Sequence, residues 1–382
     1  MGNRRWAIVA GLLLVSLTGR LFAQQPVLWH DPSPHTVQFV TVDENVKLEV
    51  LDWGGSGKPL VLLAGLGNTA HVFDDFAPKL TSEYRVYGIT RRGFGASSIP
   101  ATGYSADRLA DDVLAVLDAL KLDRPVLVGH SIAGEELSSI AARKPERVAG
   151  LIYLDAGYAL AFYHRSRATL GMDLVQLRKK LDELQPNPNG LSNRALVQEL
   201  LQSDLPVIEK DLQEQQMYGQ AFPPQSQIAD PPGPGTDDLA NFEAFRAYLK
   251  RVRGVGFPEA ELRQSHESKP NGGVGKRVDQ LSVSEAIRVG EQKYTDIRVP
   301  VLAIYANPQD PSPYDFDTFS TPAARAAAEA IPTAETEEQA KAFEMGVPSA
   351  RVVRLPHANH YVFLSNEPDV LREMRAFLAG LH

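Results

Sequence analysis

The 382-residue sequence contains no cysteine. Disulfide bonds, thiolate catalysis and cysteine-ligated metals are therefore excluded. An excess of positive charge is also lacking, because 39 Lys and Arg stand against 47 Asp and Glu and give a net charge of −8 with neutral histidines. No basic stripe with interleaved aromatics is found, so we expect no nucleic-acid partner. A hydrophobic content of 43% is ordinary for a globular protein that buries a sizeable core.

Residues 1–23 have the pattern of a secretory signal peptide. Two arginines precede an apolar run from Trp6 to about Thr18, and Ala23 supplies a small residue at the expected cleavage site. The run of roughly 13 apolar residues is shorter than the ~20 needed to span a bilayer. We therefore expect a secreted or periplasmic protein. Because Arg20 lies close to the cleavage site, an uncleaved N-terminal membrane anchor is the alternative, and membrane contact is expected only through this segment.

Eight short apolar or alternating runs predict strands. The first two flank a short turn, which predicts an antiparallel pair. The others alternate with helical patterns at about 70–80, 106–120 and 133–143, which predicts crossover connections and an α/β fold with a mostly parallel eight-stranded sheet flanked by helices. The expected strands are 37–42, 46–53, 60–64, 84–89, 126–128, 151–154, 301–305 and 351–355.

No strand-like run occurs between Leu154 and Val301, and the apolar residues there follow helical periodicity. We interpret this block as a helical cap inserted into one sheet domain. Two tracts rich in proline and glycine, 222–238 and 265–276, are expected to be loops, either surface linkers or mobile segments over a site. The expected organisation is a signal peptide at 1–23, a core at 36–157, the cap at 158–296 and the rest of the core at 297–382.

Ser131 lies where a buried-strand pattern turns into a helical one. The sequence Gly129-His-Ser-Ile-Ala-Gly134 has small residues on both sides of the serine, as a tight strand–turn–helix corner requires. A serine hydroxyl becomes an effective nucleophile when a positioned histidine takes its proton and a carboxylate orients that histidine. Asp310 and His360 follow two later strands, and the carboxyl ends of parallel strands meet at one edge of the sheet. We therefore expect Ser131, His360 and Asp310 to be catalytic.

The chain resembles the α/β-hydrolase superfamily, specifically its serine hydrolase branch with a helical cap. The resemblance is carried by the Ser131 turn, Asp310, the Ala358-Asn-His360 segment, and the loops Leu62–Gly67 and Arg91–Ser97. Ala64 and Thr90 depart from the histidine and aspartate often found at these places, and the loop before Asp310 is one residue longer than usual. The resemblance implies an oxyanion hole formed by the backbone N–H groups of Leu66 and Ile132.

Several assignments have competitors. His357 competes with His360 as the base, while Asp155, at the end of an earlier strand, competes with Asp310 as the acid. Asp315 and Asp317, in the same loop as Asp310, are further alternatives. The remaining polar residues are expected to be structural: His71 at a surface or helix start, Glu135 and Glu136 in a first helical turn, and Arg91 and Arg92 anchoring a turn.

These features predict an exported serine esterase, carboxylesterase-like, that acts on a small acyl substrate through a Ser-His-Asp triad and an acyl-enzyme. The alternatives are hydrolysis of amides, lactones or C–C bonds, or a binding protein that keeps the scaffold without turnover. No cofactor is expected. No metal site is expected either, because the histidines are scattered along the sequence. The sequence predicts nothing about the oligomeric state.

Overall fold

The computed structural model describes residues 29–164, 170–184, 193–221, 233–278, 280–310 and 322–381. The chain divides into two units, Met1–His30 and Asp31–His382, and the second contains all the elements described below. The expected signal peptide lies outside the described residues. Among those residues, no helix has the length and apolar character needed to cross a membrane.

The second unit is built on an eight-stranded sheet of order β1-β2-β4-β3-β5-β6-β9-β10. β1 pairs antiparallel with β2, β2 pairs antiparallel with β4, and all other pairs are parallel. The predicted α/β fold is therefore confirmed. The strands are β1 Thr36–Asp43, β2 Val46–Gly54, β3 Pro59–Leu63, β4 Arg85–Ile89, β5 Val126–His130, β6 Gly150–Leu154, β9 Val301–Ala306 and β10 Ala350–Leu355.

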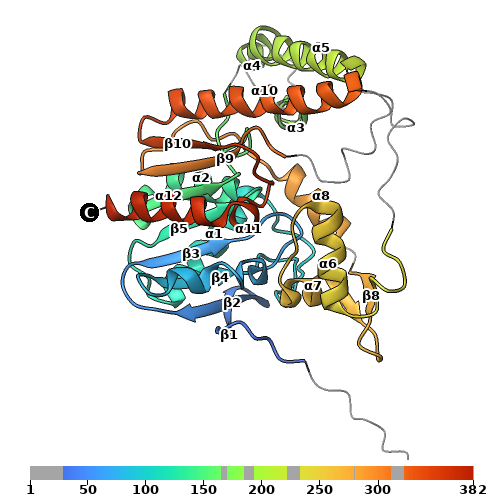
Figure 1. Cartoon of the computed structure of the whole chain (residues 1–382). Coiled ribbons are helices and arrows are strands. Elements are labelled where there is room, and N and C mark those ends of the chain that lie inside the picture. Colours follow the sequence, from blue (N-terminus) through green and yellow to red (C-terminus); the bar gives the residue numbers. More distant parts are fainter. Residues whose placement is uncertain are drawn as a thin grey trace, which may run out of the picture. The chain divides into compact units, whose positions relative to one another are not determined.

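Helices cover both faces of the sheet (Figure 1). Alternate residues of the central strands pack into two separate cores. Leu60 and Leu62 of β3 belong to the core that receives residues of the 3₁₀ turns and α12, whereas Val61 and Leu63 belong to the core that receives α1, α2 and α10. Apolar side chains on both faces explain why β3 is a continuous hydrophobic run. The covering elements are η1 Ala70–Phe73, η2 Ala77–Leu80, α1 Ala106–Ala119, α2 Ala133–Arg143, η3 Pro145–Arg147, α10 Pro322–Gly346, α11 Val362–Ser365 and α12 Glu367–Ala379.

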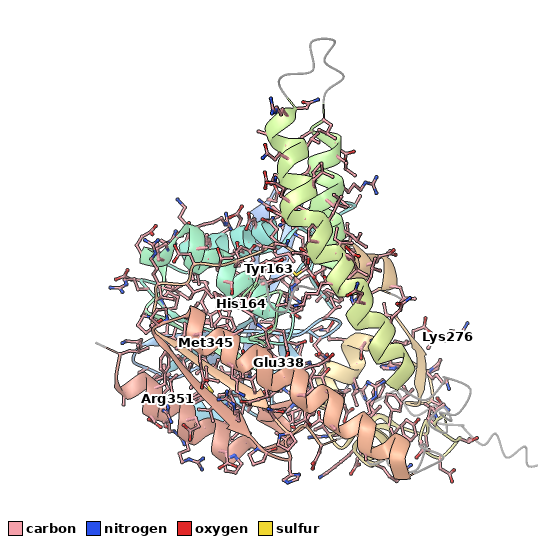
Figure 2. The ribbon with its side chains drawn as sticks, turned by 90° about the horizontal axis from the view of Figure 1, so that it is seen from above. Tyr163, His164, Lys276, Glu338, Met345 and Arg351 are labelled. Carbon is pink, nitrogen blue, oxygen red and sulfur yellow. The ribbon has the colours of Figure 1, made fainter. Side chains whose placement is uncertain are left out.

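The segment between β6 and β9 is mainly helical, as expected, but it also contains a hairpin. The tract 265–276, expected to be a loop, forms most of the antiparallel pair β7–β8, near the labelled Lys276 in Figure 2. Of the tract 222–238, residues 222–232 lie outside the described part. The elements are α3 Leu170–Asp182, α4 Arg194–Glu199, the π-helical turn η5 Leu200–Asp204, α5 Leu205–Ala221, α6 Phe242–Arg253, α7 Glu259–Ser265, β7 His266–Ser268, β8 Val274–Arg277 and α8 Leu281–Val289.

Candidate active site

Ser131 occupies the turn between β5 and α2 with a φ of +54°. Few residues other than glycine adopt this left-handed conformation, and its cost is of order 1–3 kcal/mol. The small neighbours are required by close packing, because a Cβ on Gly134 would lie 2.1 Å from the carbonyl oxygen of Ala156. The strand–turn–helix corner that the sequence indicated is therefore present, and it holds Ser131 at the carboxyl end of β5.

The loop after β3, residues 64–69 (the oxyanion loop), lies against this corner. A Cβ on Gly65 would be 3.2 Å from Cβ of Ser131 and 2.8 Å from Nδ1 of His130, so only glycine lets the loop approach. The amides of Leu66 and Ile132 donate no hydrogen bond to any other described residue. Two unpaired N–H groups beside a strained serine are the donors that an oxyanion hole requires. Leu66 and Ile132 are the two residues that the resemblance names for this role, and they remain the candidates for it.

His360 lies in the loop after β10, and its Nδ1 is 2.6 Å from Oδ2 of Asp155. Asp155 directly follows β6, is completely buried and has a φ of +46°. Its other oxygen accepts a hydrogen bond of 2.9 Å from the amide of Ala306. The carboxylate is thus fixed at both oxygens, and it holds His360 with Nδ1 protonated and Nε2 available as a base.

The expectation that Asp310 orients His360 is not met by this geometry. Oδ1 of Asp310 lies 2.8 Å from Nδ1 of His357, and both side chains are at least half exposed. The two competitors named from the sequence, His357 and Asp155, therefore belong to different pairs: Asp310 with His357 at the surface, and Asp155 with His360 in the interior. Asp315 and Asp317 lie outside the described residues.

His130, immediately before Ser131, is a site residue that the sequence analysis missed. Its ring centroid is 4.7 Å from that of His360, and its Nε2 donates to the carbonyl oxygen of His360 over 3.1 Å. Burial lowers the pKa of His130 well below its usual value, as does the proximity of His360. A neutral His130 therefore ties the His360 loop to the end of β5. The buried position next to the serine in Gly129-His-Ser was the only sequence sign of this role.

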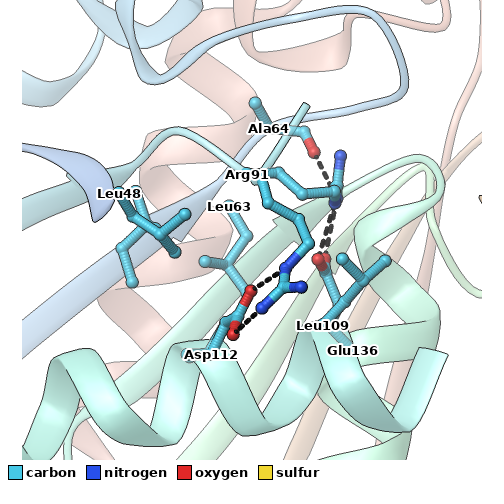
Figure 3. A pocket seen from close by; sticks show the side chains of 10 residues that line it. Leu48, Leu63, Ala64, Arg91, Leu109, Asp112 and Glu136 are labelled. Carbon is cyan, nitrogen blue, oxygen red and sulfur yellow. Dashed lines mark hydrogen bonds and ion pairs between the residues drawn. The ribbon is translucent and has the colours of Figure 1, made fainter. Parts of the chain in front are cut away.

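Two buried arginines support the site, as expected for anchors of a turn. The guanidinium of Arg91 binds Glu136 in α2 through two contacts of 2.6 and 2.7 Å, and its Nη2 donates to the carbonyl oxygen of Ala64 over 2.9 Å. Arg92 makes a similar pair of contacts with Asp112 in α1. Figure 3 shows Arg91 between Ala64 and Glu136, at the base of the oxyanion loop.

Three further polar residues lie where the sequence placed them along the chain, but all are buried. Glu135 and Glu136 are in the first turn of α2, as expected, and neither carboxylate oxygen of Glu135 has a hydrogen-bond partner among the described residues. Burial, together with the adjacent Glu136, raises the pKa of Glu135 well above its usual value. His71 lies near the start of the 3₁₀ turn η1, one of the two expected places, and it is buried, not at the surface.

A cavity of about 140 Å³ borders the oxyanion loop and is covered by α6, α7 and the β7–β8 hairpin. Leu66, Tyr361, Arg253 and Arg277 are among the residues lining it. The guanidinium groups of Arg253 and Arg277 form no ion pair with any described residue. The segment between β6 and β9 therefore lines a small recess beside the candidate oxyanion hole, with two positive charges exposed at it.

Glu261 connects α7 to the loop after β3. Its carboxylate accepts hydrogen bonds from Nδ2 of Asn68 over 2.8 Å and from the amide of Thr69 over 3.1 Å. Burial raises the pKa of Glu261 to about 7, although these hydrogen bonds oppose the shift. The folded protein therefore holds this proton more tightly than the unfolded chain does.

We expect the stability contributed by Glu261 to be full below pH about 4.5 and to be lost as the pH rises through about 7. The difference in pKa corresponds to roughly 3 kcal/mol. Urea unfolding at several pH values between 4.5 and 8 should show a decline in the wild type that is clearly smaller in Glu261→Gln, because the glutamine cannot ionise. Parallel profiles for the two proteins would contradict this assignment.

A protein-family model described as "alpha/beta hydrolase fold" matches residues 58–367. The chain is 37% identical over 120 residues to a non-heme chloroperoxidase of Streptomyces lividans, covering 31% of this chain and 44% of that protein. It is 32% identical over 150 residues to epoxide hydrolase 4 of Mus musculus, covering 37% of this chain and 40% of that protein. The matched part thus spans about two fifths of these relatives.

Among solved structures, E-2-(acetamidomethylene)succinate hydrolase superposes with a TM-score of 0.54. The alignment covers 91% of this chain and all of that chain, at 17% sequence identity. At this identity the likeness shows a common fold and carries no information on substrate.

Proposed function

Because the chain belongs to the α/β-hydrolase fold family, we propose that it is a serine hydrolase that cleaves a carboxylic ester or a related acyl bond through an acyl-enzyme. The observation that carries the proposal is the 2.6 Å contact between Asp155 and His360 at the same sheet edge as the strained Ser131. An aspartate at position 131 would be the nucleophile of the epoxide hydrolase type of chemistry; the hydroxyl of serine favours acyl transfer.

In the proposed reaction, Oγ of Ser131 attacks the acyl carbonyl carbon while Nε2 of His360 takes the hydroxyl proton. Asp155 stabilises the resulting imidazolium, and the amides of Leu66 and Ile132 bind the oxyanion. His360 then passes its proton to the leaving alcohol as the C–O bond breaks. Water, deprotonated by His360, attacks the acyl-enzyme and releases the acid and free Ser131.

Export is part of the proposal and is supported by the sequence of residues 1–23 alone. We propose that the protein acts in the periplasm or outside the cell, as the mature chain beginning at Gln24. A small acyl compound is the proposed substrate. Since Arg253 and Arg277 lie at the cavity beside Leu66, a substrate panel of chromogenic esters, amides and lactones is best extended with esters that carry a free carboxylate.

We expect a fluorophosphonate probe to label the mature chain with a stoichiometry of one, and Ser131→Ala to abolish both labelling and ester turnover. The probe forms a covalent bond only with an activated serine, so labelling reports on Ser131 and its base together. Ser282→Ala, which removes an exposed hydroxyl in α8, is the matched control and should label normally.

Unchanged labelling or turnover in Ser131→Ala would overturn the assignment of the nucleophile. A folded wild-type chain that binds acyl compounds but shows neither labelling nor turnover would support the alternative of a binding protein.

A further inference from the structure

We propose that Asp31, His35, His71 and Asp74 form a binding site for one divalent transition-metal ion, with Zn²⁺ as the best match. The site is independent of the proposed hydrolase activity. Scattered histidines led to the expectation of no metal site. However, the fold brings the segment before β1 against η1, which places two histidines and two aspartates together.

The spacing of the donor atoms suits a tetrahedral ion. One nitrogen or oxygen atom from each residue lies within 4.8 Å of the others. Nδ1 of His71 is 2.8 Å from Oδ2 of Asp74 and 3.4 Å from Oδ2 of Asp31, and Nδ1 of His35 is 3.1 Å from Oδ1 of Asp74. Zn–N and Zn–O bonds of about 2.0–2.2 Å set ligand atoms about 3.3–3.6 Å apart in a tetrahedron.

Two of these atoms lack hydrogen-bond partners among the described residues. Nδ1 of His35 and Oδ2 of Asp31 are buried and make no hydrogen bond to a described residue, although each lies within ion-pair distance of a neighbour, Asp74 and His71 respectively. The side chain of His35 is only 3% exposed. The contact between Nδ1 of His35 and Oδ1 of Asp74 is short but lacks hydrogen-bond geometry. A cation bound among the four residues would satisfy both Nδ1 of His35 and Oδ2 of Asp31.

Glu49 and Trp53 contact two of the four residues from outside the cluster, as outer residues do around metal ligands. Oε1 of Glu49 lies 3.6 Å from Nε2 of His71, and Nε1 of Trp53 donates to Oδ1 of Asp74 over 3.2 Å. Such outer contacts orient the ligating imidazole and carboxylate.

The nitrogen and oxygen donors distinguish the possible ions. Two imidazoles with two carboxylates suit Zn²⁺, whereas Ca²⁺ and Mg²⁺ prefer sets made of oxygen only. The site links the segment before β1 to η1, which begins just after the loop bearing Leu66. We infer a structural role, in which the ion fixes the N-terminal part of the unit to the sheet.

The test uses the mature chain without a histidine tag. After loading with Zn²⁺ and exhaustive dialysis, elemental analysis should find about one Zn²⁺ per chain. Zn²⁺ should raise the unfolding midpoint by at least about 3 °C relative to the chelated protein, and Mg²⁺ and Ca²⁺ should not. Asp31→Asn, at the most exposed of the four residues, should weaken Zn²⁺ binding by more than the ~10–100-fold that loss of an outer contact costs.

His357→Asn is the control, because His357 also contacts an aspartate but lies exposed at the surface; it should bind Zn²⁺ like the wild type. If Asp31→Asn does not fold, His35→Gln replaces it. Absence of retained Zn²⁺ and of any thermal shift would overturn the proposal. An unchanged affinity in the folded variant, an equal loss in His357→Asn, or a response to Mg²⁺ or Ca²⁺ alone would also overturn it. None of these results depends on hydrolase activity.

Discussion

Asp155→Asn is expected to lower kcat for ester hydrolysis by about 10⁴, whereas Asp310→Asn should leave it within about twofold. The amide of asparagine presents an N–H to Nδ1 of His360, which stabilises the tautomer with the proton on Nε2. That tautomer cannot accept the proton of Ser131. Because Asn occupies the same volume as Asp and its oxygen can still accept from the amide of Ala306, we expect the fold to be retained.

Steady-state kinetics of the two variants on one chromogenic ester distinguish the alternatives directly. Asp310 is half exposed and its partner His357 is three-quarters exposed, so their pair contributes little to structure or rate. A severe loss in Asp310→Asn with near-normal turnover in Asp155→Asn would return the acid role to Asp310. Equal and mild losses in both would mean that no buried carboxylate orients the base.

The sheet was predictable because its strands are continuous apolar or alternating runs. Each of the eight strands begins and ends within two residues of its expected limits. The hairpin β7–β8 was missed because a strand of three or four residues has no detectable period. The helix expected at about 70–80 is instead two 3₁₀ turns, η1 and η2, with Pro78 in the second.

The sequence identified both candidate acids, but the prediction favoured Asp310, whereas the structure pairs Asp155 with His360. β6 lies between β5 and β9 in the sheet, so Asp155 and Asp310 both follow strands at the same edge. The choice depends on the direction of the loop after β10. That loop is held over β5 by the hydrogen bond from His130 to the carbonyl oxygen of His360, which places the imidazole beside Asp155. This contact joins residues 230 positions apart. A contact between residues so distant in the chain could not be predicted from the spacing of motifs in the sequence.

The second large effect is expected at the buried ion pair beneath the oxyanion loop. Glu136→Gln should lower the free energy of unfolding by about 3–5 kcal/mol, because it leaves the guanidinium of Arg91 buried without a countercharge. Asp111→Asn breaks the partly exposed contact with Arg143 and should cost less than about 1 kcal/mol. Urea unfolding of both variants provides the comparison. Similar small losses would show that Arg91 finds another partner or water.

Replacing both members of the pair separates stability from catalysis. Arg91→Met with Glu136→Leu removes both buried charges, so unfolding free energy should recover most of the loss seen in Glu136→Gln. The carbonyl oxygens of Ala64 and Gly65 nevertheless lose their contacts with Arg91, and these residues directly precede the proposed oxyanion donor Leu66. We therefore expect kcat to remain at least about tenfold low while KM changes little, since a displaced oxyanion donor affects the transition state more than substrate binding. Full recovery of kcat in the stable double variant would show that the loop holds its position without the arginine.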